Sequence, residues 1–204
     1  GRVHRVLIFD CDVHQGDGTA RLLEDQPDAV TVSLHCEQNF PARKAQSDWD
    51  IPLPRGMGDG DYLKVVDDIL NYLLPIYQPD LVLYDAGVDV HKDDALGYLQ
   101  LTDAGLAARD EAVLQHCLGR DIPVLGVIGG GYSKDHAALA RRGALLDSFI
   151  QHIDPFPTPF GIQLTLAARG FKKAAPPLPI GPTAQRQADA FADWFSGFEV
   201  AMRD

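Results

Sequence analysis

The feature that most constrains the fold is a set of four short apolar runs spaced along the first two thirds of the chain. The runs are rich in β-branched residues and largely apolar on both faces, and they cover residues 5–10, 29–34, 80–87 and 124–130. Such strands are typical of a parallel sheet that helices cover on both sides. We therefore predict that these runs form the buried strands of a mostly parallel sheet.

Helical patterns separate the apolar runs. Apolar residues recur at three- and four-residue spacing over residues 60–77, 102–119 and 134–153, which indicates amphipathic helices. Thr102 is placed to cap the second of these helices at its start, and Gly119 is placed to end it. Strands that alternate with helices predict an α/β domain, and a length of 204 residues suits one domain.

The character of the sequence changes at Asp154. Pro and Gly are frequent in the stretch that follows, as they are in linkers, and residues 188–202 then repeat apolar residues at roughly helical spacing. We expect residues 1–153 to form the α/β domain and residues 154–204 to be a linker followed by an amphipathic helix. Packing on the core of the same domain is the simplest interpretation of that helix, and docking on a partner is the alternative.

The charge and the cysteines of the chain exclude several classes of protein. A formal net charge of −11 argues against non-specific binding to nucleic acid or to an anionic membrane. No apolar run approaches the ~18 residues that a membrane span needs, and no signal-peptide pattern opens the sequence. The cysteines are Cys11, Cys36 and Cys117, and they are too far apart for a Cys-x-x-Cys pair. This spacing favours free, buried thiols in a reducing, cytoplasmic compartment.

Acids and a histidine follow the predicted strands at the points where those strands end. Asp10, Asp12 and His14 follow the first strand, Asp89 follows the third, and Tyr132 follows the glycines that end the fourth. In a parallel α/β sheet, ligands gather outside the carboxyl ends of the strands. Asp12 and His14 point the same way in an extended segment, and Asp89 would complete a set of ligands that is typical of catalytic zinc. Acids that merely cap turns are the alternative.

The sequence of residues 10–18 excludes a calcium-binding EF-hand loop and leaves a phosphatase motif open. An EF-hand loop from Asp10 would need Gly at its sixth position and Glu at its twelfth, where this chain has Gln15 and Arg21. The segment also resembles the strand end of haloacid-dehalogenase-type magnesium phosphatases, with Asp10 as nucleophile, although their Gly-Thr pair follows the second Asp directly. The Gly-rich run at residues 126–131 matches no nucleotide-binding pattern.

The order and spacing of four motifs resemble the zinc-dependent histone deacetylase family: DCDVHQGDGT, TVSLH, YDAGVDVHKDDALGYLQLT and GGGYSKD. The sequences of the segments DVHQGDG and LGYLQLT are most similar to those of class IV and bacterial members. The resemblance covers about residues 2–153 and implies an arginase-like, three-layer α/β fold, with residues 1–153 as the C-terminal part of the catalytic domain. The family's pair of catalytic histidines lies upstream of the first motif, in a segment that this sequence does not contain.

The resemblance implies the site residues of a zinc-dependent amide hydrolase. Asp12, His14 and Asp89 would be the zinc ligands, and zinc would activate a water for attack and polarise the acyl carbonyl. Tyr132 would donate its hydroxyl to the carbonyl oxygen as negative charge develops there.

Further residues match supporting positions of the family. Asp10 and Asp17 correspond to carboxylates that orient the two catalytic histidines. A structural potassium ion would be held by oxygen atoms of Asp10, Ser33 and Leu34, together with main-chain oxygens of the first two zinc ligands, and would steady the loop. The residues that would line the acyl-lysine tunnel are Phe40, Leu96, Gly130 and Gly131.

These features together favour a cytoplasmic, zinc-dependent deacetylase that removes acetyl or acyl groups from lysine in a protein or from an acylated small amine. No direct contact with nucleic acid or membrane is expected. Because the histidine pair is not in the sequence, a second hypothesis is a non-catalytic remnant or binding module of the same fold. The magnesium phosphatase is the third.

Overall fold

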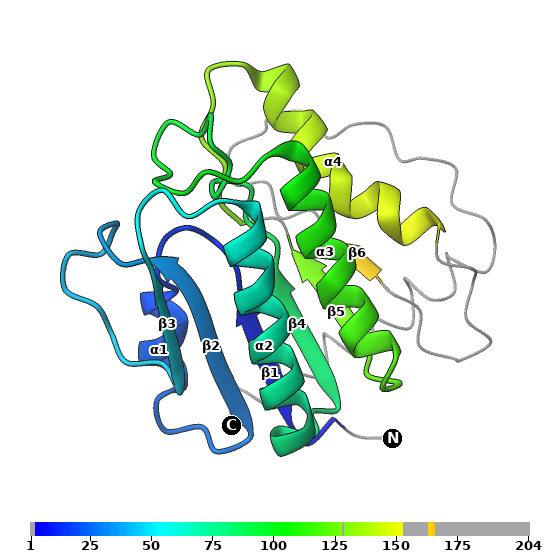
Figure 1. Ribbon diagram of the computed structural model, residues 1–204. Helices are drawn as coiled ribbons and strands as arrows, with labels where there is room; N and C mark the ends of the chain where they lie inside the picture. The colour runs from blue at the N-terminus through cyan, green and yellow to red at the C-terminus, as the bar shows by residue number, and fades with distance from the viewer. Residues whose placement is uncertain (1–2, 128, 153–162, 166–204) are drawn as a thin grey trace.

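One parallel sheet organises the chain. The computed structural model describes residues 3–127, 129–152 and 163–165. The strands are β1 (Val6–Asp10), β2 (Ala29–Cys36), β3 (Trp49–Leu53), β4 (Leu81–Asp85), β5 (Val124–Val127) and β6 (Gln163–Thr165). They pair in parallel in the order β3-β2-β1-β4-β5-β6, so β1 and β4 lie at the centre (Figure 1). The four predicted strands are confirmed as β1, β2, β4 and β5.

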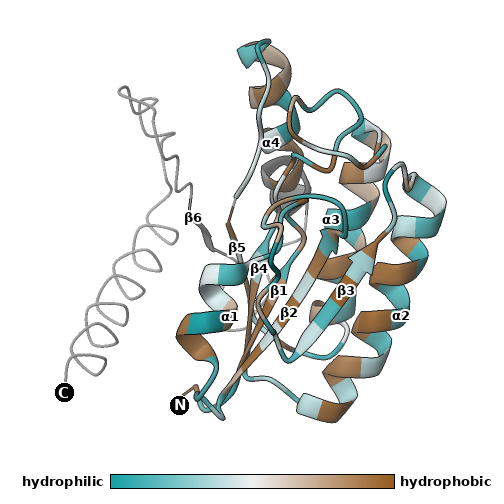
Figure 2. Cartoon of the chain, turned by 90° about the vertical axis from the view of Figure 1, so that its left-hand side faces the viewer, coloured by the Kyte–Doolittle hydropathy of each residue, from teal (hydrophilic) through white to brown (hydrophobic). Residues whose placement is uncertain are grey.

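Helices cover both faces of this sheet. The helices are α1 (Asp17–Leu23), α2 (Asp59–Tyr77), α3 (Asp103–Leu118) and α4 (His136–His152). Figure 2 shows α1 on one face and α2 with α3 on the other, and α4 packs against α3. The three-layer α/β architecture that the sequence predicts is therefore confirmed. None of the helices in the described part of the chain is long and apolar enough to cross a membrane.

Local hydrogen bonds explain where the predicted helices begin and end. The Thr102 hydroxyl accepts a 3.1 Å hydrogen bond from the backbone N–H of Gly105, which confirms Thr102 as the N-cap of α3. Thr102 also donates from its N–H and its hydroxyl to the two carboxylate oxygens of Asp59, in the first turn of α2. The starts of α2 and α3 are thereby joined. At the other end of α3, the N–H of Gly119 donates to the carbonyl of Gln115.

The sequence patterns did not indicate three of the elements. β3 contains Pro52, which a strand tolerates at the edge of a sheet because no ladder hydrogen bond is lost on the open side. α1 has 7 residues, too few for a helical period to show. β6 has 3 residues and lies in the stretch expected to be a linker. The rest of residues 154–204, including the predicted amphipathic helix, lies outside the described residues.

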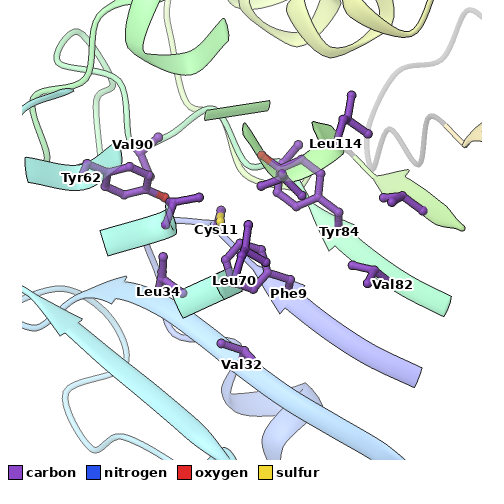
Figure 3. Close-up of a cluster of buried hydrophobic side chains, with 14 of the residues drawn as sticks. Phe9, Cys11, Val32, Leu34, Tyr62, Leu70, Val82, Tyr84, Val90 and Leu114 are labelled. Atoms are coloured by element: carbon purple, nitrogen blue, oxygen red, sulfur yellow. The ribbon is translucent and has the colours of Figure 1, made fainter. Parts of the chain in front are cut away.

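The hydrophobic core lies between the sheet and the helices, and it includes Phe9 and Tyr84 of the central strands and Leu70 of α2 (Figure 3). The cysteines Cys11, Cys36 and Cys117 are all buried and free, as predicted. The strand ends meet at one edge above this core. Asp10, the last residue of β1, lies beside Ser33 of β2 and Asp85 of β4 in the sheet register. The loops that follow the central strands therefore leave the sheet side by side.

Candidate metal centre

The loop after β1 orients its own polar side chains. The backbone N–H of Asp12 donates to Oδ1 of Asp10 at 2.9 Å, and the N–H of His14 donates to Oδ1 of Asp12 at 2.8 Å. Each aspartate thus accepts from the residue two positions on, which is how an Asp side chain stabilises a turn. This confirms the turn-capping role that the sequence left open, but the same carboxylates have further contacts.

Asp12, His14 and Asp89 converge at the edge of the sheet. Nδ1 of His14 lies 3.0 Å from Oδ1 of Asp12 and 3.1 Å from Oδ2 of Asp89. One ligand atom from each residue lies within 4.8 Å of the other two. The second oxygen of Asp89 accepts the backbone N–H of Val13 at 2.8 Å, which locks the loop after β4 to the loop after β1. The structure therefore brings together the three residues that the sequence singled out.

The electrostatics of this cluster suit a cation. Burial raises the pKa of Asp89 to about 7. Burial also works to raise the pKa of Asp12, but hydrogen bonds from the ring and backbone nitrogens of His14 outweigh it and lower that pKa. The hydrogen bonds to Asp12 and then to Asp89 raise the pKa of His14 to about 10. The carboxyl groups of Asp12 and Asp89 thus favour a positive charge at the position between them, which a divalent metal would supply.

A glycine leaves the space that such an ion would need. The backbone N–H of Gly130 donates to Oδ2 of Asp12 at 2.7 Å. A Cβ atom built on Gly130 would lie 2.0 Å from Oδ2 of Asp89 and 2.2 Å from Oδ2 of Asp12. Two carboxylates, an imidazole nitrogen and an uncrowded approach fit the donor set of zinc. Gly131 differs, because a Cβ atom there would contact Leu139 and Val88 instead.

Aromatic and apolar side chains surround the centre on its exposed side. The Tyr132 ring meets the His14 ring edge-on, with centroids 5.8 Å apart. The centroid of the Phe40 ring lies 6.5 Å from that of the His14 ring. Phe40 is 65% exposed and Leu96 is 50% exposed, so both apolar side chains are open to solvent. The side-chain amide of Asn39 donates to the carbonyl of Leu96 at 2.9 Å. The loop of Phe40 and the turn of Leu96 therefore adjoin.

The remaining predicted residues lie beside or behind the centre. Asp10 is buried at the end of β1, where burial and then the Asp85 carboxylate hold its pKa well above the usual range. Ser33 is buried beside it on β2, followed by Leu34. Asp17 forms an ion pair with Arg21, one turn further along α1. The potassium assignment and the histidine-orienting roles of Asp10 and Asp17 stay predictions.

Gln15 supports the site although sequence reasoning gave it no role. It is 3% exposed, and its side-chain amide donates to the carbonyl of Ala45 and to the carboxylate of Asp50. Its side-chain oxygen accepts the N–H of Ala45, and its own N–H donates to the carbonyl of Phe40. Gln15 thus ties the metal-site loop to the segment that carries Phe40. Nothing in the amino-acid sequence distinguishes this buried side-chain amide from one exposed to solvent.

Arg109 of α3 is a second buried support. It is fully buried and donates to the carbonyls of Gly87 at 2.7 Å and Ala86 at 3.2 Å, just before Asp89 in the chain. Its charge is balanced by Asp110, which also accepts from the Tyr84 hydroxyl at 2.6 Å. A helical pattern predicts a surface position for most charged residues, so this buried pair was not foreseen.

Comparison with known sequences finds relatives for most of the described chain. A family model for the histone deacetylase domain matches residues 1–146. A protein of Picosynechococcus sp. is 50% identical over 146 residues, which cover 72% of this chain and 49% of that protein. Histone deacetylase 2 of Arabidopsis thaliana is 32% identical over 140 residues, 67% of this chain and 36% of its own length. A probable deacetylase of Archaeoglobus fulgidus is 30% identical over 147 residues, 65% of this chain and 40% of its own length.

The chain therefore spans about half or less of the length of these relatives. Comparison with solved structures agrees with the sequence matches. The crystal structure of the HDA15 HD domain superposes with a TM-score of 0.62 at 24% identity, over 74% of this chain and 46% of that one. At this identity the match establishes a shared fold.

Proposed function

Because the chain belongs to the histone deacetylase family, we propose that it carries the metal centre of a zinc-dependent hydrolase that removes acetyl or acyl groups from lysine or related amines. The observation that supports this most is the convergence of Asp12, His14 and Asp89 beside the phenol of Tyr132. Two carboxylates, an imidazole and an adjacent hydroxyl donor are the parts that metal-assisted amide hydrolysis needs.

Asp12, His14 and Asp89 would hold the zinc ion. When bound, zinc supplies a Lewis acid that polarises the acyl carbonyl and makes water more acidic. The chain's own contribution is to hold the ligands in place. The N–H groups of Val13 and Gly130 donate to Asp89 and Asp12, so that neither carboxylate is free to turn away.

Tyr132 would stabilise the negative charge that develops on the acyl oxygen. Burial raises its pKa, and the carboxylates of Asp12 and Asp89 raise it further. The phenol therefore keeps its proton at neutral pH and is able to donate a hydrogen bond. A neutral donor held next to the metal centre stabilises an oxyanion more than water does, because it needs no reorientation.

The substrate would be an acyl-lysine in a protein or an acylated small amine. Phe40 and Leu96 lie beside the centre and are exposed, so they are available to contact an alkyl chain. The methylene chain of lysine suits apolar walls of this kind, while its acyl end reaches the metal.

We also infer a potassium site at Asp10, Ser33 and Leu34. Its support is that Asp10 and Ser33 are buried register neighbours on β1 and β2, directly behind two of the zinc ligands.

Among the described residues, the carboxylates of Asp10 and Asp17 hydrogen-bond to no histidine. Their partners are the N–H of Asp12 and the guanidinium of Arg21. A non-catalytic remnant or binding module of the same fold stays the second candidate.

Incubation of the zinc-loaded chain with acetylated and acylated lysine peptides and with acetylated polyamines tests the proposal. Release of the free amine that a chelator abolishes, and that Tyr132→Phe lowers, would support the hydrolase. Zinc-dependent binding of the same peptides without release would favour the binding module instead. The phosphatase hypothesis is disfavoured by family membership and by the burial of Asp10, its required nucleophile.

A further inference from the structure

Asp94 uses both of its carboxylate oxygens on backbone N–H groups near the metal centre. Oδ1 accepts from the N–H of Leu96 at 2.8 Å and from the N–H of Gly97 at 2.9 Å. Oδ2 accepts from the N–H of Tyr132 at 2.6 Å, across 38 residues of sequence. One side chain therefore shapes the turn that carries Leu96 and holds the backbone of Tyr132 to it.

A second hydrogen bond strengthens this connection. The N–H of Ala95 donates to the carbonyl of Tyr132 at 2.8 Å, so the backbone of Tyr132 is held through its donor and its acceptor. The other side of the turn is held by Asn39, which donates to the carbonyl of Leu96. The Phe40 loop, the Leu96 turn and the Tyr132 loop are thus joined around the exposed side of the centre.

The turn that carries Leu96 packs against the proposed metal centre. The N–H of Asp94 donates to the carbonyl of His91 at 3.0 Å, which closes a tight loop after Asp89. A Cβ atom on Gly97 would lie 1.9 Å from the carbonyl oxygen of Asp89, so the turn packs directly on the backbone of that residue. The hydrogen bonds of Asp94 therefore place the Leu96 turn and the backbone of Tyr132 relative to Asp89.

We propose that Asp94 is a positioning residue that fixes the Tyr132 phenol and the Leu96 turn at a set place relative to the metal centre. This inference rests on the proposed function and deepens it. A phenol that acts on a developing oxyanion must be held before the reaction, because a hydroxyl that has to find its position loses much of its effect. Tyr132 is on an exposed loop, so its placement depends on such hydrogen bonds.

The neighbouring acid supplies a matched control. Asp93 is 63% exposed, and its carboxylate faces Arg142 at 3.2 Å instead of Tyr132. The substitution Asp94→Asn is selective, because its amide oxygen still accepts the N–H groups of Leu96 and Gly97. Its NH₂ group, however, cannot accept from the N–H of Tyr132. Asp94→Asn therefore keeps the turn and removes the connection to Tyr132.

Hydrogen exchange on the zinc-loaded chain measures the connection directly. We expect Asp94→Asn to speed exchange in the peptide that contains Tyr132 by about tenfold or more, because a charge-assisted hydrogen bond is lost. Asp93→Asn should leave that exchange unchanged, and both variants should bind zinc as the parent does. Unchanged exchange at Tyr132 in Asp94→Asn would overturn the proposal.

Kinetics on an acetyl-lysine peptide separate positioning from mere support of the fold. Asp94→Asn should lower kcat about tenfold with little change in KM, and should cause almost no further loss in a Tyr132→Phe background. Asp93→Asn should leave both parameters at the parent values. Losses that multiply in the double variant would overturn the inference. If the parent chain binds zinc but hydrolyses nothing, the proposed function and the catalytic purpose of Asp94 both fail, while the exchange result still decides whether Asp94 holds Tyr132.

Discussion

The backbone N–H of Gly130 donates a 2.7 Å hydrogen bond to Oδ2 of Asp12, across 118 residues of sequence. This contact connects the loop after β5 to Asp12, a proposed zinc ligand on the loop after β1. It requires the backbone of residue 130 to lie against two carboxylates, and a side chain at this position would enter the space between them. The metal centre thus depends on a position that contributes no side chain.

Replacement of Gly130 by alanine should therefore abolish tight zinc binding. The new methyl group would overlap the oxygens of Asp89 and Asp12, so we expect the zinc affinity to fall by about 100-fold or more. Calorimetric titration with zinc measures the change. Gly18→Ala is the matched control, because a Cβ atom on Gly18 meets nothing within 4 Å. Parent-like zinc affinity in Gly130→Ala would contradict the prediction.

Loss of the His14 ring should remove the link between zinc and stability. Zinc that binds only the folded state stabilises it, by about 2.7 kcal/mol when the free metal is 100 times Kd. We expect zinc to raise the Tm of the parent and to leave the Tm of His14→Ala unchanged. His116→Ala is the control, since that histidine pairs with Asp67 on the helical face. A zinc-induced rise in the Tm of His14→Ala would count against the metal centre.

The exposed ring of Phe40 should matter for binding and not for stability. We expect Phe40→Ala to raise KM for an acyl-lysine peptide about tenfold, because apolar contact with the alkyl chain is lost, and to change kcat little. Leu22→Ala is the control, because Leu22 is 82% exposed on α1 and has no place in the site. Equal effects of the two variants on KM would show that Phe40 does not contact the substrate.

Arg109 should be among the most sensitive positions of the fold. Arg109→Met leaves Asp110 and two backbone carbonyls without their buried partner, so we expect the free energy of unfolding to fall by about 3–5 kcal/mol. Urea denaturation measures this loss. Arg120→Met, in the exposed turn after α3, should cost less than about 1 kcal/mol. A loss of similar size at both positions would refute the structural role of Arg109.

The buried thiols should be unreactive in the folded chain. Burial raises the pKa of Cys11 and of Cys117 to about 12, so both stay protonated as the pH rises from 7 to 9. Labelling with a thiol reagent should therefore be slow over this whole range, whereas in urea all three thiols should react and faster at pH 9. Rapid labelling of the folded chain at pH 9 would mean that the core opens readily.

Much of the fold followed from local patterns. The apolar runs at 5–10 and 80–87 indicated buried strands, and the β-sheet places them side by side as β1 and β4. Thr102 marked the start of α3 because a hydroxyl that caps an N-terminus acts within a few residues. β3 and α1 escaped prediction, since the first contains a proline and the second is too short to show a period.

The convergence of the candidate ligand residues could also be inferred from the sequence. Asp12, His14 and Asp89 follow strands of a parallel sheet, whose carboxyl ends share one edge, and their side chains have the chemistry of metal ligands. Position and residue type were therefore sufficient to expect them together, before any distance was known.

The tertiary structure decided how residues of identical type divide their roles. Asp93 and Asp94 are adjacent and carry the same side chain, yet one faces Arg142 and the other holds Tyr132. Gly130 and Gly131 are likewise adjacent, and only the first adjoins the carboxylates. These differences arise because loops distant in sequence meet at one edge of the sheet. Local periodicity carries no information about which backbone N–H groups a carboxylate will meet there. The sequence therefore indicated the candidate ligands, and the tertiary structure decided which contacts hold them in place.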